Sequence, residues 1–300
     1  MSNISESAYS DKVNRVVTAL FSVVALISFL PVLLVFIVSV SSQESVAAVG
    51  YSFFPKSLSL EAYRYLFLSG TYLLRAFVNS VLITVFGTAL GLALMCPFAY
   101  ALSRPDFRYK KVLFVFIMIP MLFSGGLVSS YMINTQLFHL GNTYLALFLP
   151  GLCSTWYILI MRNYFNDSIP SEMIEAAKLD GCSHPGIFLW IVLPVSKPVI
   201  MTVAVFQIFA YWNSWYPSLL YIDSNHTELY PLQYVLVNME RSIETITNDA
   251  QFMSGMQSYS PPAVTIRMAM VVTVILPIMI LFPFFRKFLT NGLTVGSVKG

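Results

Sequence analysis

The feature that most constrains the fold of this chain is a series of six long apolar runs that contain almost no charged residues. The runs cover approximately residues 16–40, 79–102, 112–134, 144–165, 198–222 and 264–286. A run of about twenty apolar residues is long enough for a helix to cross the hydrocarbon core of a bilayer. The runs are too long and too continuous for the strands of a closed barrel, the other structure that can span lipid. The sequence therefore predicts an all-α membrane protein with six transmembrane helices.

The composition of the chain agrees with this prediction. Of the 300 residues, 57% are hydrophobic and 10% are charged, whereas charged residues make up about a quarter of a typical soluble domain. The first apolar run is too long for a cleavable signal peptide, and no small-residue cleavage site follows it. We expect no disulfide framework, because Cys96 and Cys153 fall inside predicted helices and Cys182 falls in a polar loop.

The distribution of lysine and arginine predicts the orientation of the helices. If the N-terminus is inside, twelve of the 17 basic residues lie on the cytoplasmic side, and four of them crowd into the connection 103–111. Short loops rich in lysine and arginine stay in the cytoplasm. We therefore expect both termini to be cytoplasmic. The expected layout is a tail at 1–15, a transmembrane domain at 16–286 with a cytoplasmic loop at 166–197 and an outer loop at 223–262, and a tail at 287–300.

The cytoplasmic loop carries the signals of a short helix. Pro170 suits the first turn, where a missing N–H costs nothing. Glu172 and Glu175 would then lie near the positive end of the helix dipole, and Gly181 fits a left-handed C-terminal cap. We expect its apolar stripe to consist of Met173, Ala176, Ala177 and Leu179. Further along, Pro194 and Pro198 are expected to bend the chain before the fifth apolar run.

The same loop resembles the EAA loop of ABC importer permeases. The residues that carry the resemblance are Glu175, Ala176, Ala177, Asp180, Gly181, Ile191, Leu193, Pro194 and Pro198. Cys182 departs from the small alanine usual in the family. The resemblance implies the type I ABC importer permease architecture, with this loop as a coupling helix that docks in a cleft of an ATPase subunit. The residues it implies for ATPase coupling are Glu172, Glu175, Ala176, Ala177, Asp180 and Gly181.

Weaker motifs resemble the carbohydrate-uptake permeases, in particular the second of the two maltose-type subunits. They are the Trp212-Asn213 pair, the run 230–233 and the closing run 296–300. This resemblance implies a sugar or oligosaccharide substrate, a second homologous permease subunit, two ATPase subunits and an extracytoplasmic solute-binding protein. It places the chain in the cell membrane of a prokaryote. It implies no cofactor in this chain, since ATP and Mg would be bound by the ATPase partners.

Two local patterns each allow two interpretations. The aromatic and amide residues Tyr211, Trp212, Asn213 and Trp215 end the fifth apolar run. They could form an aromatic belt at the outer interface, or a surface on which sugar rings stack. The G-x-x-x-G pair of Gly87 and Gly91 lets helices approach closely, and we favour packing inside the subunit over a homodimer interface.

Several functions are excluded by motifs that the chain lacks. There is no phosphate-binding loop, and the run 292–299 has the wrong spacing for one. The three histidines, His139, His184 and His226, are too far apart in sequence to suggest a zinc site. The basic cluster 104–111 follows the positive-inside rule, so it does not indicate nucleic-acid binding. Buried carboxylates that could relay protons are absent from the apolar runs. The alternatives that remain are a sodium-coupled secondary carrier working without an ATPase, and a receptor or assembly factor.

Overall fold

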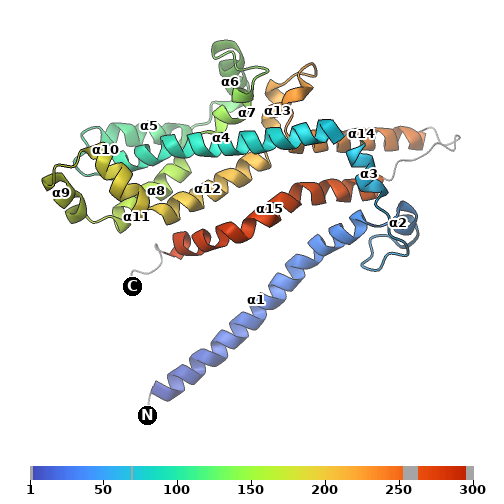
Figure 1. The fold of residues 1–300 in the computed structure, drawn as a ribbon, viewed down its shortest axis with the longest axis horizontal. Coiled ribbons are helices and arrows are strands. Elements are labelled where there is room, and N and C mark those ends of the chain that lie inside the picture. Colours follow the sequence, from blue (N-terminus) through green and yellow to red (C-terminus); the bar gives the residue numbers. More distant parts are fainter. Residues whose placement is uncertain (1–2, 69, 253–262, 295–300) are drawn as a thin grey trace. The chain divides into compact units, whose positions relative to one another are not determined.

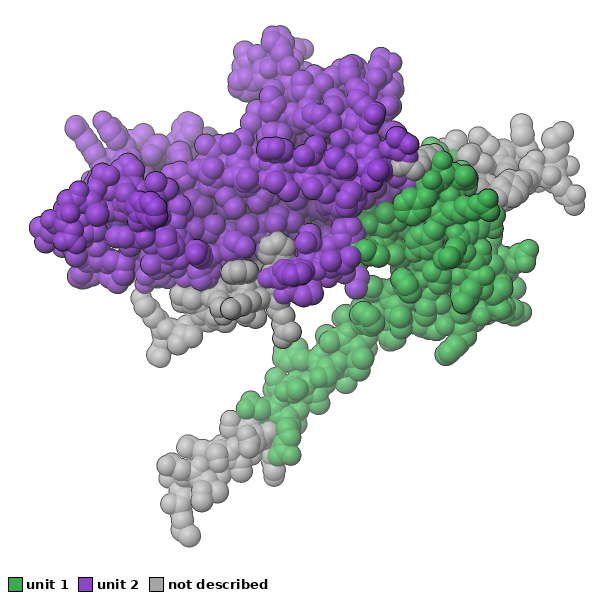
Figure 2. All heavy atoms as spheres, viewed as in Figure 1, with its two compact units in different colours: residues 1–70, 240–276 green, residues 71–239, 277–300 purple. Residues whose placement is uncertain are grey.

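A computed structural model describes residues 3–68, 70–252 and 263–294. Its regular structure is helical throughout this part of the chain, apart from one bridge between Ser41 and Leu58. The chain divides into two compact units (Figure 2). Unit 1 contains residues 1–70 and 240–276, and unit 2 contains residues 71–239 and 277–300.

Unit 1 contains the first three helices. These are α1 (Asn3–Ser39), α2 (Gln43–Val49) and α3 (Glu61–Phe67). The hydroxyls of Ser39 and Tyr63 lie 2.8 Å apart and link the end of α1 to α3. The helix α1 begins at Asn3, so most of the predicted tail 1–15 is helical and continuous with the first apolar run. The polar residues of this segment did not indicate a helix, because they lack an apolar stripe.

Unit 2 contains most of the helices (Figure 1). They are α4 (Gly70–Ser103), α5 (Lys110–Leu122), α6 (Gly126–Met132), the π-helix η1 (Ile133–Leu137), α7 (Tyr144–Phe148), η2 (Leu149–Gly151), α8 (Thr155–Ser168), α9 (Ser171–Leu179), α10 (His184–Ile187), the π-helix η3 (Phe188–Val192), α11 (Leu193–Val195), α12 (Lys197–Trp212), α13 (Tyr216–Tyr221) and η4 (Thr227–Leu229). The last two helices, α14 (Leu232–Phe252) and α15 (Ala263–Thr294), contribute residues to both units.

Three helices of the described residues are long and apolar enough to cross a membrane, and they lie within α1, α4 and α15. Three further apolar segments each consist of two helices separated by a short break. The helices 110–122 and 126–137 are bent by 116° relative to each other. The bend is 51° between 144–151 and 155–168, and 78° between 184–195 and 197–212. If each pair crosses the membrane once, the six predicted spans correspond to three uninterrupted helices and three bent pairs of helices.

The largest bend replaces the single helix predicted at 112–134. The chain leaves α5 at Phe123 in an extended conformation, and Gly126 has a φ of 83°. A positive φ is accessible to glycine without a steric penalty. The sequence Ser124-Gly125-Gly126 thus interrupts a run that is apolar enough to continue as a helix.

The carbonyl groups around the break between α7 and α8 are hydrogen-bonded by side chains of a single neighbouring helix, α12. Gln207 on α12 donates from Nε2 to the carbonyl oxygen of Leu152 at 3.1 Å. Tyr211, one turn further along α12, donates to the carbonyl oxygen of Phe148 at 3.0 Å. A broken helix at membrane depth is tolerated where neighbouring groups satisfy the freed carbonyls, and α12 supplies two such donors here.

The G-x-x-x-G pair packs inside the subunit, as we favoured. A Cβ atom on Gly91 would lie 2.7 Å from both Nε2 of Gln207 and the carbonyl oxygen of Leu152. A Cβ on Gly87 would lie 2.7 Å from the ring of Tyr211. The two glycines therefore let α4 approach α12 closely enough for the hydrogen bonds at the break to form.

The segment predicted as an outer loop, 223–262, contains a long helix. Residues 232–252 form α14, and 253–262 lie outside the described residues. Leu232, Val235 and Leu236 are buried at helical spacing, a pattern that could have predicted the helix. At the other end of the chain, α15 continues to Thr294, so the predicted tail 287–300 also begins as a helix.

Candidate functional site

The short helix α9 occupies the predicted position in the segment 166–197, at one end of the unit 2 ribbon (Figure 1). Pro170 lies one residue earlier than predicted, directly before the helix, with φ −58° and ψ 144°. Glu172 is in the first turn, where its negative charge interacts favourably with the unpaired N–H groups and the positive end of the helix dipole. Local signals therefore place the start of α9 to within one residue.

The C-terminus of α9 is closed by a Schellman motif. The N–H of Cys182 donates to the carbonyl oxygen of Ala177 at 3.0 Å, and the N–H of Gly181 donates to that of Lys178 at 3.0 Å. Gly181 has a φ of 82°, so the left-handed cap predicted from the sequence is confirmed. These two bonds satisfy carbonyls that otherwise lack a partner at a helix end.

The helix α9 has one buried face and one exposed face. Ile174 and Ala177, three residues apart, pack into a hydrophobic cluster together with residues of α4, α8 and α12. The stripe predicted from Met173, Ala176, Ala177 and Leu179 is therefore wrong except at Ala177, because Ile174 has the spacing that faces the core. The exposed positions include Glu172, Glu175, Ala176, Asp180 and Gly181.

An apolar side chain stands out among the exposed residues of α9. Leu179 is 89% exposed, and Met173 is also exposed. The exposed face of α9, together with the residue that follows the helix, thus presents two apolar side chains among three carboxylates, those of Glu172, Glu175 and Asp180.

An ion pair joins α9 to the connection between α4 and α5. Lys178 donates from Nζ to Oδ2 of Asp106 at 2.7 Å, and both side chains are partly exposed. This hydrogen bond holds the pKa of Asp106 below its ordinary value. The carboxyl group of Asp106 therefore stays ionised at neutral pH.

After α9 the chain turns sharply before α12. Ser183 is the N-cap of α10, and its hydroxyl oxygen accepts a hydrogen bond from the N–H of Gly186 at 3.4 Å. The segment 184–195 meets α12 at an angle of 78°, with the break at Ser196. This break lies between Pro194 and Pro198, so the predicted bend is confirmed.

The aromatic cluster at the end of α12 is divided between different environments. Tyr211 is buried between Gly87 of α4 and the carbonyl oxygen of Phe148 on α7, as described above. Trp212 is also buried and meets the ring of Phe77 edge-on, with 5.8 Å between ring centroids. Asn213 ends α12 and donates to the carbonyl oxygen of Phe209 at 2.9 Å. Trp215 lies in the break before α13, edge-on to Tyr216. The four predicted residues thus do not form one continuous stacking surface.

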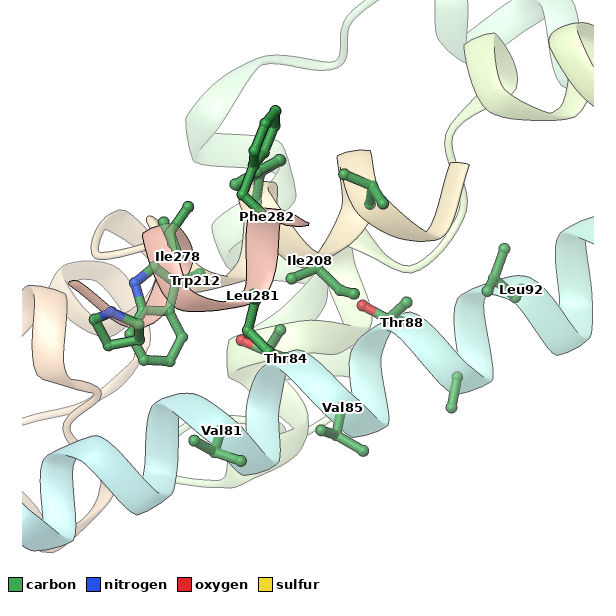
Figure 3. A pocket seen from close by; sticks show the side chains of 14 residues that line it. Val81, Thr84, Val85, Thr88, Leu92, Ile208, Trp212, Ile278, Leu281 and Phe282 are labelled. Atoms are coloured by element: carbon green, nitrogen blue, oxygen red, sulfur yellow. The ribbon is translucent and has the colours of Figure 1, made fainter. Parts of the chain in front are cut away.

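Trp212 instead lines a cavity of about 390 Å³ between α4, α12 and residues 277–282 of α15. Figure 3 shows the indole of Trp212 at one end and the hydroxyls of Thr84 and Thr88 on α4. The other lining residues are apolar. Sequence reasoning missed this cavity, because its walls come from helices far apart in the chain.

The run 230–233 is fixed to the beginning of α4. Asn79 donates from Nδ2 to the carbonyl oxygens of Glu228 at 2.7 Å and Tyr230 at 3.0 Å. Ser80 accepts a hydrogen bond from the N–H of Leu232 at 2.8 Å. The start of α14 is therefore positioned by two adjacent polar side chains of a transmembrane helix.

Comparisons with known proteins agree with these features. Residues 87–222 match a family described as "Binding-protein-dependent transport system inner membrane component". The chain is 38% identical to Protein LplC of Bacillus subtilis (strain 168) over 279 residues, which cover 92% of this chain and 91% of the relative. It is 37% identical over 278 residues to the polygalacturonan/rhamnogalacturonan transport system permease protein YtcP of the same organism, covering 92% and 94%.

A solved structure shows a similar fold. It is a bacterial ABC transporter involved in the import of the acidic polysaccharide alginate, matched with a TM-score of 0.77 and 28% identity. The match covers 93% of this chain and 97% of that chain. The matched family region, 87–222, includes α9, the bend at Ser196 and the aromatic cluster. The chain therefore belongs to the family of binding-protein-dependent transport system inner membrane components, as a permease subunit of an ABC transporter and not an enzyme.

Proposed function

We propose that this chain forms half of the translocation pathway of an ATP-driven importer, and that α9 is the helix through which ATPase subunits act on it. The observation that carries the proposal is the division of α9 into two faces. Ile174 and Ala177 anchor it in the subunit core, while Glu175, Asp180 and Leu179 face outward. A capped, rigid helix of this kind can be held in a cleft of another protein and move with it.

The mechanism follows from the connections of α9. Closing of an ATPase dimer on ATP would displace the cleft and the helix seated in it. The segment 184–195 joins α9 to α12, which carries Tyr211 and Trp212 at its far end. Alternating access then requires two discrete arrangements of these helices, of which ATP favours one.

We propose a sugar or oligosaccharide as the substrate. The support is the substrates for which two of the similar proteins described above are named, polygalacturonan or rhamnogalacturonan for one and alginate for the other. Within this chain, Trp212, Asn213 and Trp215 remain the candidates for substrate contact. Tyr211 would act through packing, since its ring and hydroxyl are both engaged with neighbouring helices.

The proposed assembly contains a second homologous permease subunit, two ATPase subunits that bind ATP and Mg, and an extracytoplasmic solute-binding protein. The chain would lie in the cell membrane of a prokaryote, with both termini and α9 in the cytoplasm. The outer segment that begins with η4 and α14 would face the solute-binding protein, because an importer must receive its ligand on that side.

Two substitutions, one on α9 and one at the turn that ends it, test this function. The variants Glu175→Lys and Gly181→Asp are made in the intact transporter, purified through a tag on this chain and reconstituted into vesicles. We expect less ATPase to co-purify, or ATP hydrolysis without uptake. The matched control is Glu44→Lys, a reversal at an exposed carboxylate on α2 of unit 1. Normal co-purification and normal ATP-driven uptake in both α9 variants would contradict the assignment.

A further inference from the structure

Two arginines near the ends of α4 and α8 cap each other's helices. Arg104, just beyond α4, donates from Nη2 to the carbonyl oxygen of Phe165 in the last turn of α8 at 3.3 Å. Arg162 on α8 donates from Nε to the carbonyl oxygen of Leu102 in the last turn of α4 at 3.3 Å. The last carbonyls of a helix lack partners and carry partial negative charge. Each helix end is therefore stabilised by a cation attached to the other.

The exchanged arginines are held in place by further contacts. Arg104 is only 7% exposed, and its guanidinium lies 5.3 Å from the ring centre of Tyr100 on α4. Arg162 lies 5.5 Å from the ring centre of Phe114 on α5. A guanidinium is planar and pre-organised, so stacking and hydrogen bonding can act together on it. The ends of α4 and α8 thus form one fixed frame at this side of unit 2.

This frame is connected to α9 by the ion pair described above. Asp106 lies two residues after Arg104, in the connection 104–109. Its carboxylate accepts the hydrogen bond from Lys178 in the last turn of α9. The first contact of α9, through Ile174 and Ala177, is apolar and therefore non-directional, whereas the ion pair ties one point of the helix to one point of the frame.

We propose that Asp106 and Lys178 are positioning residues for coupling. The pair passes displacement of α9 to the joined ends of α4 and α8, in addition to the path through 184–195 to α12. This inference rests on the proposed role of α9. The pair does not dock the ATPase, so its loss changes how much transport each ATP drives and leaves the amount of bound ATPase unchanged.

A charge-swap cycle tests the pair. Asp106→Lys, Lys178→Asp and the double swap are compared in the intact transporter in vesicles that contain the loaded binding protein. The readout is substrate taken up per ATP hydrolysed, with co-purified ATPase measured in parallel. We expect each single variant to lower this ratio by about two- to five-fold, the size expected for a partly exposed ion pair. The double swap should recover most of the loss.

The neutral cycle of Asp106→Asn, Lys178→Gln and their combination covers the case in which a reversed charge prevents folding. In this cycle the double variant should show no larger decrease in substrate taken up per ATP hydrolysed than either single variant. The matched control is Asp167→Asn, which neutralises an exposed carboxylate at the end of α8. Unchanged ratios in the single variants, or losses that add in the double variants, would overturn the inference. Glu175→Lys in the same assay separates the two proposals: if it uncouples transport while the pair variants do not, only the role of the pair is wrong.

Discussion

Tyr211 lies directly over Gly87, so that a Cβ atom on this glycine would fall 2.7 Å from both Cε2 and Cζ of the tyrosine ring. Real Cβ atoms do not approach other atoms so closely, and the tyrosine hydroxyl is held by the carbonyl oxygen of Phe148. Neither partner can move without breaking a contact at the bend between α7 and α8. The pair therefore determines how closely α4 and α12 pack.

Gly87→Ala should destabilise the subunit by about 1–3 kcal/mol, the usual cost of overpacking a filled core. The measurement is the midpoint of thermal unfolding of the purified protein. Gly125→Ala is the control, because its Cβ would meet only the side chain of Ser129, at 3.9 Å. Adding Tyr211→Leu to Gly87→Ala should relieve part of the loss. Equal midpoints for Gly87→Ala and the control would show that the close approach does not matter.

Substitutions of Gly181 should follow the cost of a left-handed backbone. Gly181 has a φ of 82°, which glycine adopts without steric strain and asparagine tolerates. For other residues this left-handed conformation costs about 1–2 kcal/mol of conformational free energy. We expect Gly181→Asn to retain more hydrogen-exchange protection at the N–H of Cys182 than Gly181→Ala. Gly186→Ala is the control, since this glycine has no positive φ. Equal protection in all three variants would argue against the Schellman motif.

The ion pair of His226 and Asp223 should respond to pH. The hydrogen bond that the ring of His226 donates to Asp223, with 2.8 Å between Nδ1 and Oδ1, raises the pKa of His226, and the same contact lowers the pKa of Asp223. The pair stabilises the turn below the unfolded pKa of histidine, and this contribution is lost as the pH rises through the raised pKa. Asp223→Asn should shift the histidine titration, followed by NMR, to lower pH.

Glu228→Gln is the control for that titration. Glu228 contributes a weaker charge effect on the pKa of His226 and makes no hydrogen bond to it in the described contacts. We therefore expect a smaller shift than in Asp223→Asn. An equal shift in the two variants would show that overall charge, and not the 2.8 Å contact, sets the titration.

Trp212→Ala should weaken substrate uptake without loss of assembly, because Trp212 lines the cavity shown in Figure 3. Trp212→Phe keeps an aromatic face and should retain more activity. The measurement is the dependence of uptake rate on substrate concentration. Trp190→Ala is the control, since this tryptophan is 81% exposed on η3. Unchanged kinetics in Trp212→Ala and Asn213→Ala would favour the aromatic-belt interpretation.

The features that could be predicted from the sequence are those that depend on a few adjacent residues. Pro170, Glu172 and Gly181 indicate where α9 begins and ends, because helix caps depend on local backbone geometry. The apolar runs indicate spans, because length alone decides whether a helix can cross a bilayer. The same reasoning selected the wrong apolar stripe on α9, since a nine-residue helix offers too few positions to fix its inner face.

The remaining features depend on partners distant in the chain. The hydrogen bond from Gln207 to Leu152 lies at a break that neighbouring residues in the sequence did not indicate. The hydrogen bonds of Arg104 and Arg162 join residues about sixty positions apart in the chain. The cavity beside Trp212 likewise requires α15 to lie against α4 and α12. Such features follow from how the helices pack, and a single sequence does not determine which helix faces are in contact.

The 78° bend at Ser196 determines the direction of any motion that passes along the chain from α9. Two arms that meet almost at a right angle do not act as a piston. A push along the arm 184–195 is directed mostly across the axis of α12 and only slightly along it. The glycines Gly87 and Gly91 hold α12 against α4 at Tyr211 and Gln207, in its last two turns. The membrane helix would therefore swing at its end near Ser196, about a fixed point near its other end.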